Sequence, residues 1–265
     1  MNKHIETTSE GSTQPELTAA EIVEEARQRV EAKQSLPEKT QPALSSKQEN
    51  TVRWLNHAVF WLSKHWLALF NLLNGLYISG TFLAPILMQA GQLNAAALIY
   101  KFYKPFCHQY PVRSWFLLGS RIVAYSSTSG ILDADLHHAS EFVGNAALGY
   151  KVAFCQRDVA IYGSIFLAGL LFGLIRNKWR LPPLPWWAYI AFGIAPMGLD
   201  GGYQLISQII GGINPAWILP RESTPLLRTV TGALFGTTTI AFIYPYIHDF
   251  FEETKNLLAT RYGWR

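Results

Sequence analysis

The chain has little charge and almost no cysteine. Only 15% of its 265 residues are charged, against roughly 25% in an average soluble domain. Its two cysteines, Cys107 and Cys155, are far apart, and no C-x-x-C pair occurs. A quinone-linked membrane oxidoreductase needs one cysteine pair to take electrons and another to relay them. Two cysteines can form only one pair, so that class is disfavoured unless a partner protein supplies the second.

Two further absences narrow the class of protein. The first 50 residues contain no apolar core region, so a secretory signal peptide is not expected and the first apolar helix should act as the insertion signal. The basic residues do not cluster on a helix face, and no aromatic residues interleave with them. The net charge of +4 therefore does not indicate nucleic-acid binding.

What the chain does contain is apolar and aromatic sequence, unevenly distributed. Hydrophobic residues make up 49% of it, and the sequence after Trp66 is almost all apolar apart from one polar middle segment and a short tail. Residues 1–50 are polar and are predicted to form a disordered cytoplasmic tail with a short amphipathic helix, followed by a Pro/Ser-rich linker. This split is typical of a membrane protein with a soluble N-terminal extension.

Four apolar runs are long enough to cross a bilayer, which needs about 20 residues. The fold class predicted is all-α, a polytopic membrane domain over 51–250 followed by a cytoplasmic tail over 251–265. Residues 115–125 are too short to span and contain Arg121, so they are expected to be interfacial or re-entrant, within an outer helical or loop segment. The predicted spans are about 66–90, 156–176, 186–210 and 225–248.

Short loops set the expected orientation. Arg176–Arg180, RNKWR, holds three basic residues, which places that loop in the cytoplasm. The protein is expected in the cell membrane. With four spans, both termini lie in the cytoplasm and residues 91–158 lie on the outer side. Glycines four apart allow close helix packing, in one bundle or in a homo-oligomer or membrane complex. The glycine pairs are Gly169/Gly173, Gly198/Gly202 and Gly232/Gly236.

Ionisable residues inside a membrane are costly and mark functional sites. The predicted topology brings the polar residues of the spans and of the outer segment to one face of the membrane, although none of them was used to derive it. A polar site is therefore expected in the outer half of the bundle. Its members are Cys107, His108, Arg113, Cys155, Arg157, Asp158, Asp200, Gln204 and Arg228.

The same residues carry a resemblance. From about residue 65 to 250 the chain resembles domain-of-unknown-function family 2085, a group of prokaryotic predicted membrane proteins. The resemblance implies a membrane protein but no reaction. Many members have a third cysteine where this chain has Asp158, which counts against an all-thiolate metal site. The matching residues are Cys107-His108-Gln109 with Arg113-Ser114, Cys155-Gln156-Arg157-Asp158 with Tyr162, Pro196, Asp200-Gly201 with Gln204, and Arg228 with Thr231-Gly232.

The cysteines have two interpretations. Cys107, His108, Cys155 and Asp158 offer two thiolates, an imidazole and a carboxylate, a set that suits zinc. Against it, the neighbours Cys107 and His108 seldom reach one metal together. The alternative is a Cys107–Cys155 disulfide that staples the outer segment in a non-catalytic accessory subunit.

A third interpretation needs no thiols. Asp200 is expected to pair with Arg228 or Arg113, because an apolar span disfavours an unpaired carboxylate. The arginines would then bind a phosphate or carboxylate head group of a lipid. A small-solute transporter is disfavoured by the few ionisable residues in the inner halves of the spans. The candidate catalytic residues are Asp200, Asp158 and Arg228, and the candidate substrate-binding residues are Arg113, Arg157, Gln204, Gln109 and Tyr162.

Overall fold

The computed structural model describes most of the chain from residue 45 onward. The described residues are 24, 27–28, 45–120, 122–123, 140–179, 181–214, 217–218 and 221–264. The chain divides into two units, Met1–Leu55 and Asn56–Arg265. Most of the predicted tail and its short helix lie outside the described residues. The candidate site residues and the helix contacts that position them belong to the second unit.

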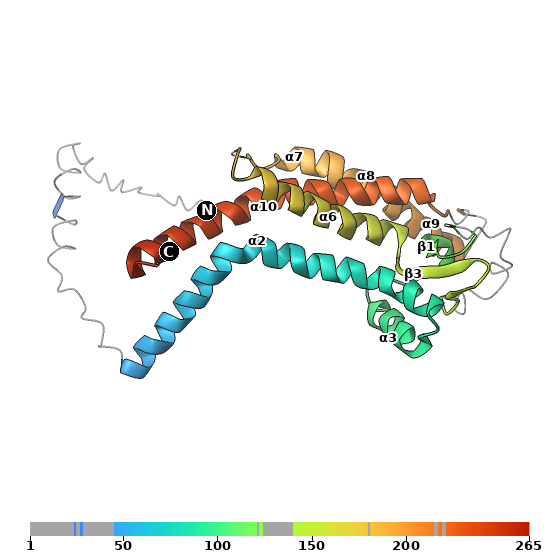
Figure 1. The fold of residues 1–265 in the computed structure, drawn as a ribbon. Helices are drawn as coiled ribbons and strands as arrows, with labels where there is room; N and C mark the ends of the chain where they lie inside the picture. The colour runs from blue at the N-terminus through green and yellow to red at the C-terminus, as the bar shows by residue number, and fades with distance from the viewer. Residues whose placement is uncertain are drawn as a thin grey trace, which may run out of the picture. The chain divides into compact units, whose positions relative to one another are not determined.

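Three long helices dominate the fold (Figure 1): α2 (Ser46–Gln89), α6 (Gln156–Ile175) and α10 (Pro225–Tyr262). Each is long and apolar enough to cross a membrane. The predicted spans 66–90, 156–176 and 225–248 lie almost wholly within these helices, and α6 begins at the residue expected. The protein is thus a mostly helical membrane protein.

The remaining predicted span is helical but not one regular helix. It consists of five consecutive elements in which α-helical and π-helical turns alternate. Pro196 lies within it and has no N–H to donate to the preceding turn, which favours a widened turn there. The elements are α7 (Trp186–Ala188), η2 (Tyr189–Ile194), α8 (Ala195–Met197), η3 (Gly198–Gly202) and α9 (Tyr203–Ile213).

Helices α6 and α10 approach each other at the backbone. A methyl group added at Gly236 would lie 2.5 Å from the carbonyl oxygen of Ile161, and one at Gly232 would lie 2.7 Å from that of Arg157. The prediction that Gly232/Gly236 permit close packing is therefore confirmed. Gly198/Gly202 make no such contact within the described part of the chain, because a methyl group at either would meet nothing there within 4 Å; their use in a homo-oligomer interface stays a prediction.

Helix α2 contacts α6 and α10 through large side chains instead. The Trp66 ring lies 5.3 Å from that of Tyr244 on α10, and the Tyr77 ring lies 5.1 Å from that of Tyr162 on α6. Asn74 adds one polar contact, donating its amide to the Tyr162 carbonyl at 3.0 Å. Bulky aromatic rings bury much apolar area, but they hold the helix axes apart.

A small antiparallel sheet lies at one end of the helices, beside α3 (Leu93–Tyr103) (Figure 1). Its strand order is β1-β3-β2. The sheet corrects the all-α prediction, and β1 overlaps residues 115–125, where no strand was expected. A four-residue strand forms only against a partner, and β1 pairs with β3 about 35 residues further along the chain. The strands are β1 (Ser114–Leu117), β2 (Gly144–Asn145) and β3 (Gly149–Cys155).

Candidate functional site

The sheet brings the two cysteines together. Ser114 on β1 pairs with Cys155 at the end of β3, and β1 follows Cys107 closely in the chain. The backbone N–H of Cys155 donates to the Cys107 sulfur at 3.3 Å. Both cysteines are free thiols in the structure.

Lys151 ties the Cys107 segment to β3, and nothing in the sequence marked it. Its side chain is fully buried, and its Nζ donates to the carbonyl oxygens of Gln109 at 2.8 Å and Ser140 at 2.7 Å. Burial lowers the pKa of Lys151 to about 8. Gln109, a candidate substrate contact, is also buried and donates its amide to the Tyr100 carbonyl at 2.8 Å. Gln109 therefore shapes the loop that carries Cys107.

Cys107, Cys155 and Asp158 form a cluster of metal-ligand type. One ligand atom from each lies within 4.8 Å of the others. The Cys155 thiol donates to the Asp158 carboxylate at 3.1 Å. The hydrogen bond with Cys155 and burial both raise the pKa of Cys107. His108 is absent from the cluster, because its exposed ring stacks on Tyr110 with centroids 5.7 Å apart.

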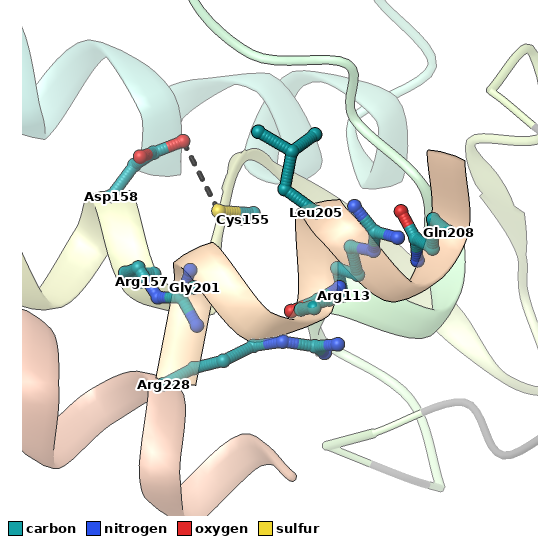
Figure 2. Close-up of a pocket in the computed structure, with 9 residues that line it drawn as sticks. Arg113, Cys155, Arg157, Asp158, Gly201, Leu205, Gln208 and Arg228 are labelled. Carbon is teal, nitrogen blue, oxygen red and sulfur yellow. Dashed lines mark hydrogen bonds between the residues drawn. The ribbon is translucent and has the colours of Figure 1, made fainter. Parts of the chain in front are cut away.

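A pocket of about 230 Å³ opens beside this cluster. Figure 2 shows Asp158 turned toward Cys155, with the guanidinium groups of Arg113, Arg157 and Arg228 around the same space. Arg157 and Arg228 lie in the first turns of α6 and α10. Helix N-termini favour negative charge, so two helix ends and three guanidinium groups all favour an anion in this pocket.

Glu222 neutralises part of this charge and was not predicted. Its half-exposed carboxylate accepts hydrogen bonds from Arg228 at 2.6 Å, Arg113 at 2.5 Å and Gln204 at 2.9 Å. Gln208 donates to it as well. Its place in the chain could have indicated this role, because Glu222 is the only acidic residue in the sequence between α9 and α10.

The partner expected for Asp200 was wrong. Its carboxylate pairs with Arg157 at 2.5 Å and not with Arg113 or Arg228. Ser223 donates its hydroxyl to the same oxygen at 2.6 Å, and Arg221 lies 3.8 Å from the other. A methyl group at Gly201 would collide with the Arg157 guanidinium, so this glycine makes room for the pair.

The remaining candidates divide between the pocket and the core. Gln204 lines the pocket, as its place one turn after Asp200 suggested. Gln109 and Tyr162 are not among the lining residues. The Tyr162 ring stacks on Phe154 with centroids 5.4 Å apart, among the aromatic residues that hold α2 against α6.

Three apolar helices capable of crossing a membrane, with a polar pocket at the end where α6 and α10 begin, define a polytopic helical membrane protein. Residues 146–242 match the family described as Predicted membrane protein (DUF2085), which confirms the resemblance. An uncharacterized protein of Methanocaldococcus jannaschii is 26% identical over 184 residues, covering 64% of this chain and 83% of that protein. No solved structure matches the chain significantly.

Proposed function

We propose that the protein binds a divalent metal ion, with zinc the best fit, through Cys107, Cys155 and Asp158. We further propose that it binds the anionic group of a lipid in the neighbouring arginine pocket. Both assignments are supported by one observation, that two residues of the metal cluster line the same pocket as the arginines. Cys155 and Asp158 line the same pocket as three arginines, so a metal and an anion bound there would be neighbours.

The donor set supports zinc. Thiolate sulfur and carboxylate oxygen are both ordinary zinc ligands, and catalytic zinc sites keep three protein ligands with a fourth position for water or substrate. The three ligands come from a loop, the end of β3 and the first turn of α6. The resemblance implies a cysteine at this position in many family members, and Asp158 would retain an anionic ligand there.

The arginines support the anion. Arg113 already engages Glu222 through two nitrogen atoms, at 3.1 and 2.5 Å, the forked geometry by which guanidinium groups bind carboxylate or phosphate. Glu222 thus occupies, from within the chain, the kind of contact that a head group would make. We expect an anionic ligand to compete with this carboxylate.

An open zinc position polarises an oxygen or activates a water molecule. The chemistry that suits this arrangement is hydrolysis of an ester bond next to the anionic group. The water oxygen would bond to the carbonyl carbon or phosphorus, the bond to the leaving oxygen would break, and a water proton would pass to that oxygen. In this scheme Asp200 is a positioning residue that holds Arg157, and the anion contacts are Arg113, Arg157, Arg228 and Gln204.

We also propose that Trp186–Ile213 is a fourth crossing and that the pocket faces outward in a prokaryotic cell membrane. The stretch packs antiparallel on α10: Tyr189 stacks on Phe242 near one end, and Gln204 reaches the Arg228 network at the other. With four crossings both termini are cytoplasmic. The basic residues Arg176 and Lys178 then also lie on that side, as the positive-inside rule expects.

Metal content and thiol state test the metal assignment. Protein purified in detergent without reductant should contain about one zinc per chain by mass spectrometry, and its thiols should alkylate only after chelator. Cys155→Ser and Asp158→Asn should lose the zinc, whereas His108→Ala should retain it because this exposed ring lies outside the cluster. Thiols that react only after reductant would establish the disulfide and refute the metal site, leaving the accessory-subunit interpretation.

Titration calorimetry tests the anion assignment with two probes, inorganic phosphate and dihexanoyl phosphatidic acid. Arg113→Gln should weaken binding at least tenfold, since it removes one forked contact. Arg221 does not line the pocket, so Arg221→Gln should change binding less than twofold. Binding of the lipid probe alone identifies a head-group site, and equal binding of both identifies a phosphate site. Equal effects of the two substitutions would refute the pocket.

A further inference from the structure

A second cavity lies between α2 and α6, along the half of α6 farthest from Asp158. Its volume is about 600 Å³, within the range of roughly 300–1,000 Å³ that small-molecule sites occupy. Its walls are largely apolar side chains from the two helices. They include Leu67, Leu72 and Leu76 of α2 and Leu170 and Leu174 of α6.

The cavity exists because of how these helices meet. The aromatic contacts of Trp66 and Tyr77 hold α2 away from α6, and Gly75 and Gly173 add no side chains to the space between. Along α2 the cavity runs from Lys64 to Ser79, roughly 22 Å at the helical rise. That length exceeds the ~15 Å of hydrocarbon in one leaflet.

One end of this apolar cavity is positively charged. Lys64 and Arg176 both line it, and neither has a carboxylate within salt-bridge distance among the described residues. The Arg176 Nε is buried and has no hydrogen-bond partner. Asn71 also lines the cavity, but its unpartnered Oδ1 lies against Gly169 of α6. A buried polar atom without a partner is costly, so a ligand that engaged it would stabilise the protein.

We infer that this groove binds one anionic phospholipid. Its phosphate would lie between Lys64 and Arg176, and an acyl chain would run along the apolar walls. An apolar channel that ends in two cations matches the two parts of such a lipid, and basic pockets between membrane helices are known to bind anionic head groups. A zwitterionic lipid offers the same chain but carries a cation that the two basic residues repel.

The inference does not depend on the proposed function. It uses no residue of the metal cluster or the arginine pocket, and the two sites lie toward opposite ends of α6. Loss of zinc or of phosphate binding would leave the groove intact. Loss of lipid from the groove would likewise leave zinc content unchanged, so failure of one proposal is distinguishable from failure of the other.

Native mass spectrometry of the full chain in detergent, with dioleoyl phosphatidylglycerol or phosphatidylcholine added, tests the groove. Wild type should bind the first at least fivefold more than the second. Lys64→Gln with Arg176→Gln should remove that preference, whereas Lys178→Gln, at the same end of α6 but outside the groove, should leave it unchanged. Ala68→Trp, which places an indole in the channel, should reduce binding of both lipids.

Each result has one meaning. Equal binding of the two lipids by wild type would overturn the inference, as would an equal loss of preference in Lys178→Gln, since that result would indicate general surface charge. If the double variant fails to fold, Ala68→Trp still decides: undiminished lipid binding to a folded Ala68→Trp protein would refute the groove.

Discussion

Helix α6 meets its two long neighbours in opposite ways. Against α10 it makes backbone contact, with Gly232 and Gly236 pressed on the carbonyl groups of α6. Against α2 it makes contact through side chains, chiefly aromatic rings with Asn71 and Asn74, and a cavity of about 600 Å³ remains between the two helices. One interface holds its residues at fixed positions, and the other leaves space that a ligand could fill.

The difference accounts for where each proposed site lies. Arg157 on α6 and Arg228 on α10 must keep a set separation to share one anion, and they lie at the end of the glycine contact. The groove needs room for an acyl chain, and it lies where side chains separate the helices. Close packing thus suits a polar site that needs geometry, while loose packing suits an apolar site that needs volume.

The largest effect expected on the α6–α10 side comes from Asp200→Asn. The pair with Arg157 is buried, with side chains 7% and 17% exposed, and removing one partner of such a pair costs about 3 kcal/mol or more. Denaturant titration in mixed micelles measures this. Glu252→Gln, in an exposed pair with Lys255, is the control and should cost under ~1 kcal/mol. Equal losses would show that the Asp200 pair is not buried in the membrane protein.

A smaller effect is expected from Gly236→Ala. The added methyl group would meet a carbonyl oxygen at 2.5 Å, and because that oxygen belongs to a helix backbone, the helices must separate. Overpacking of this kind costs about 1–3 kcal/mol. Gly202→Ala, whose methyl group would meet no described residue within 4 Å, should be neutral or slightly stabilising in the same titration. A neutral Gly236→Ala would refute the close contact.

Glu222→Gln should strengthen anion binding in the pocket. The change removes the internal carboxylate that Arg113 and Arg228 bind, and it leaves one more positive charge for a ligand. We expect phosphate affinity to rise about fivefold, equivalent to roughly 1 kcal/mol. Calorimetry against wild type measures it, with Glu252→Gln as the control. Weaker binding would mean that Glu222 positions the arginines and does not compete with the ligand.

The smallest effect is expected on the α2 side, from Gly75→Ala. Its methyl group would meet the Phe166 ring at 2.8 Å, but a ring that borders a cavity has room to turn. We expect a cost below ~1 kcal/mol, clearly less than for Gly236→Ala measured alongside it. A larger cost than at Gly236 would reverse the contrast between the two interfaces.

Much of this arrangement could be predicted from the sequence because it depends on local chemistry. Long apolar runs predicted α2, α6 and α10, since a bilayer leaves few alternatives to a helix. The convergence of Arg113, Arg157 and Arg228 could also be predicted, because the alternation of spans decides which ends lie together. The sheet was missed because β1 and β2 are only four and two residues long, and the seven-residue β3 runs directly into α6.

The ion pairs between the arginines and the carboxylates of the site could not be predicted. Three arginines and three carboxylates allow many combinations, and the sequence favoured Arg113 or Arg228 for Asp200. The choice of Arg157 depends on which α6 side chain faces Gly201, a matter of helix rotation that hydropathy does not register. The same holds for His108: adjacent to Cys107 in the chain, it lies outside the cluster with its ring stacked on Tyr110.

By itself the sequence determined that the chain is a helical membrane protein with polar residues gathered at one end of its helices. Only the tertiary structure decided that Lys151 and the sheet bring Cys107 to Cys155, that Glu222 occupies the arginines, and that α2 stands apart from α6. The physical reason is the separation along the chain over which each interaction acts. Hydropathy and charge act along a segment, whereas partners for buried hydrogen bonds and ion pairs come from segments far apart in the chain.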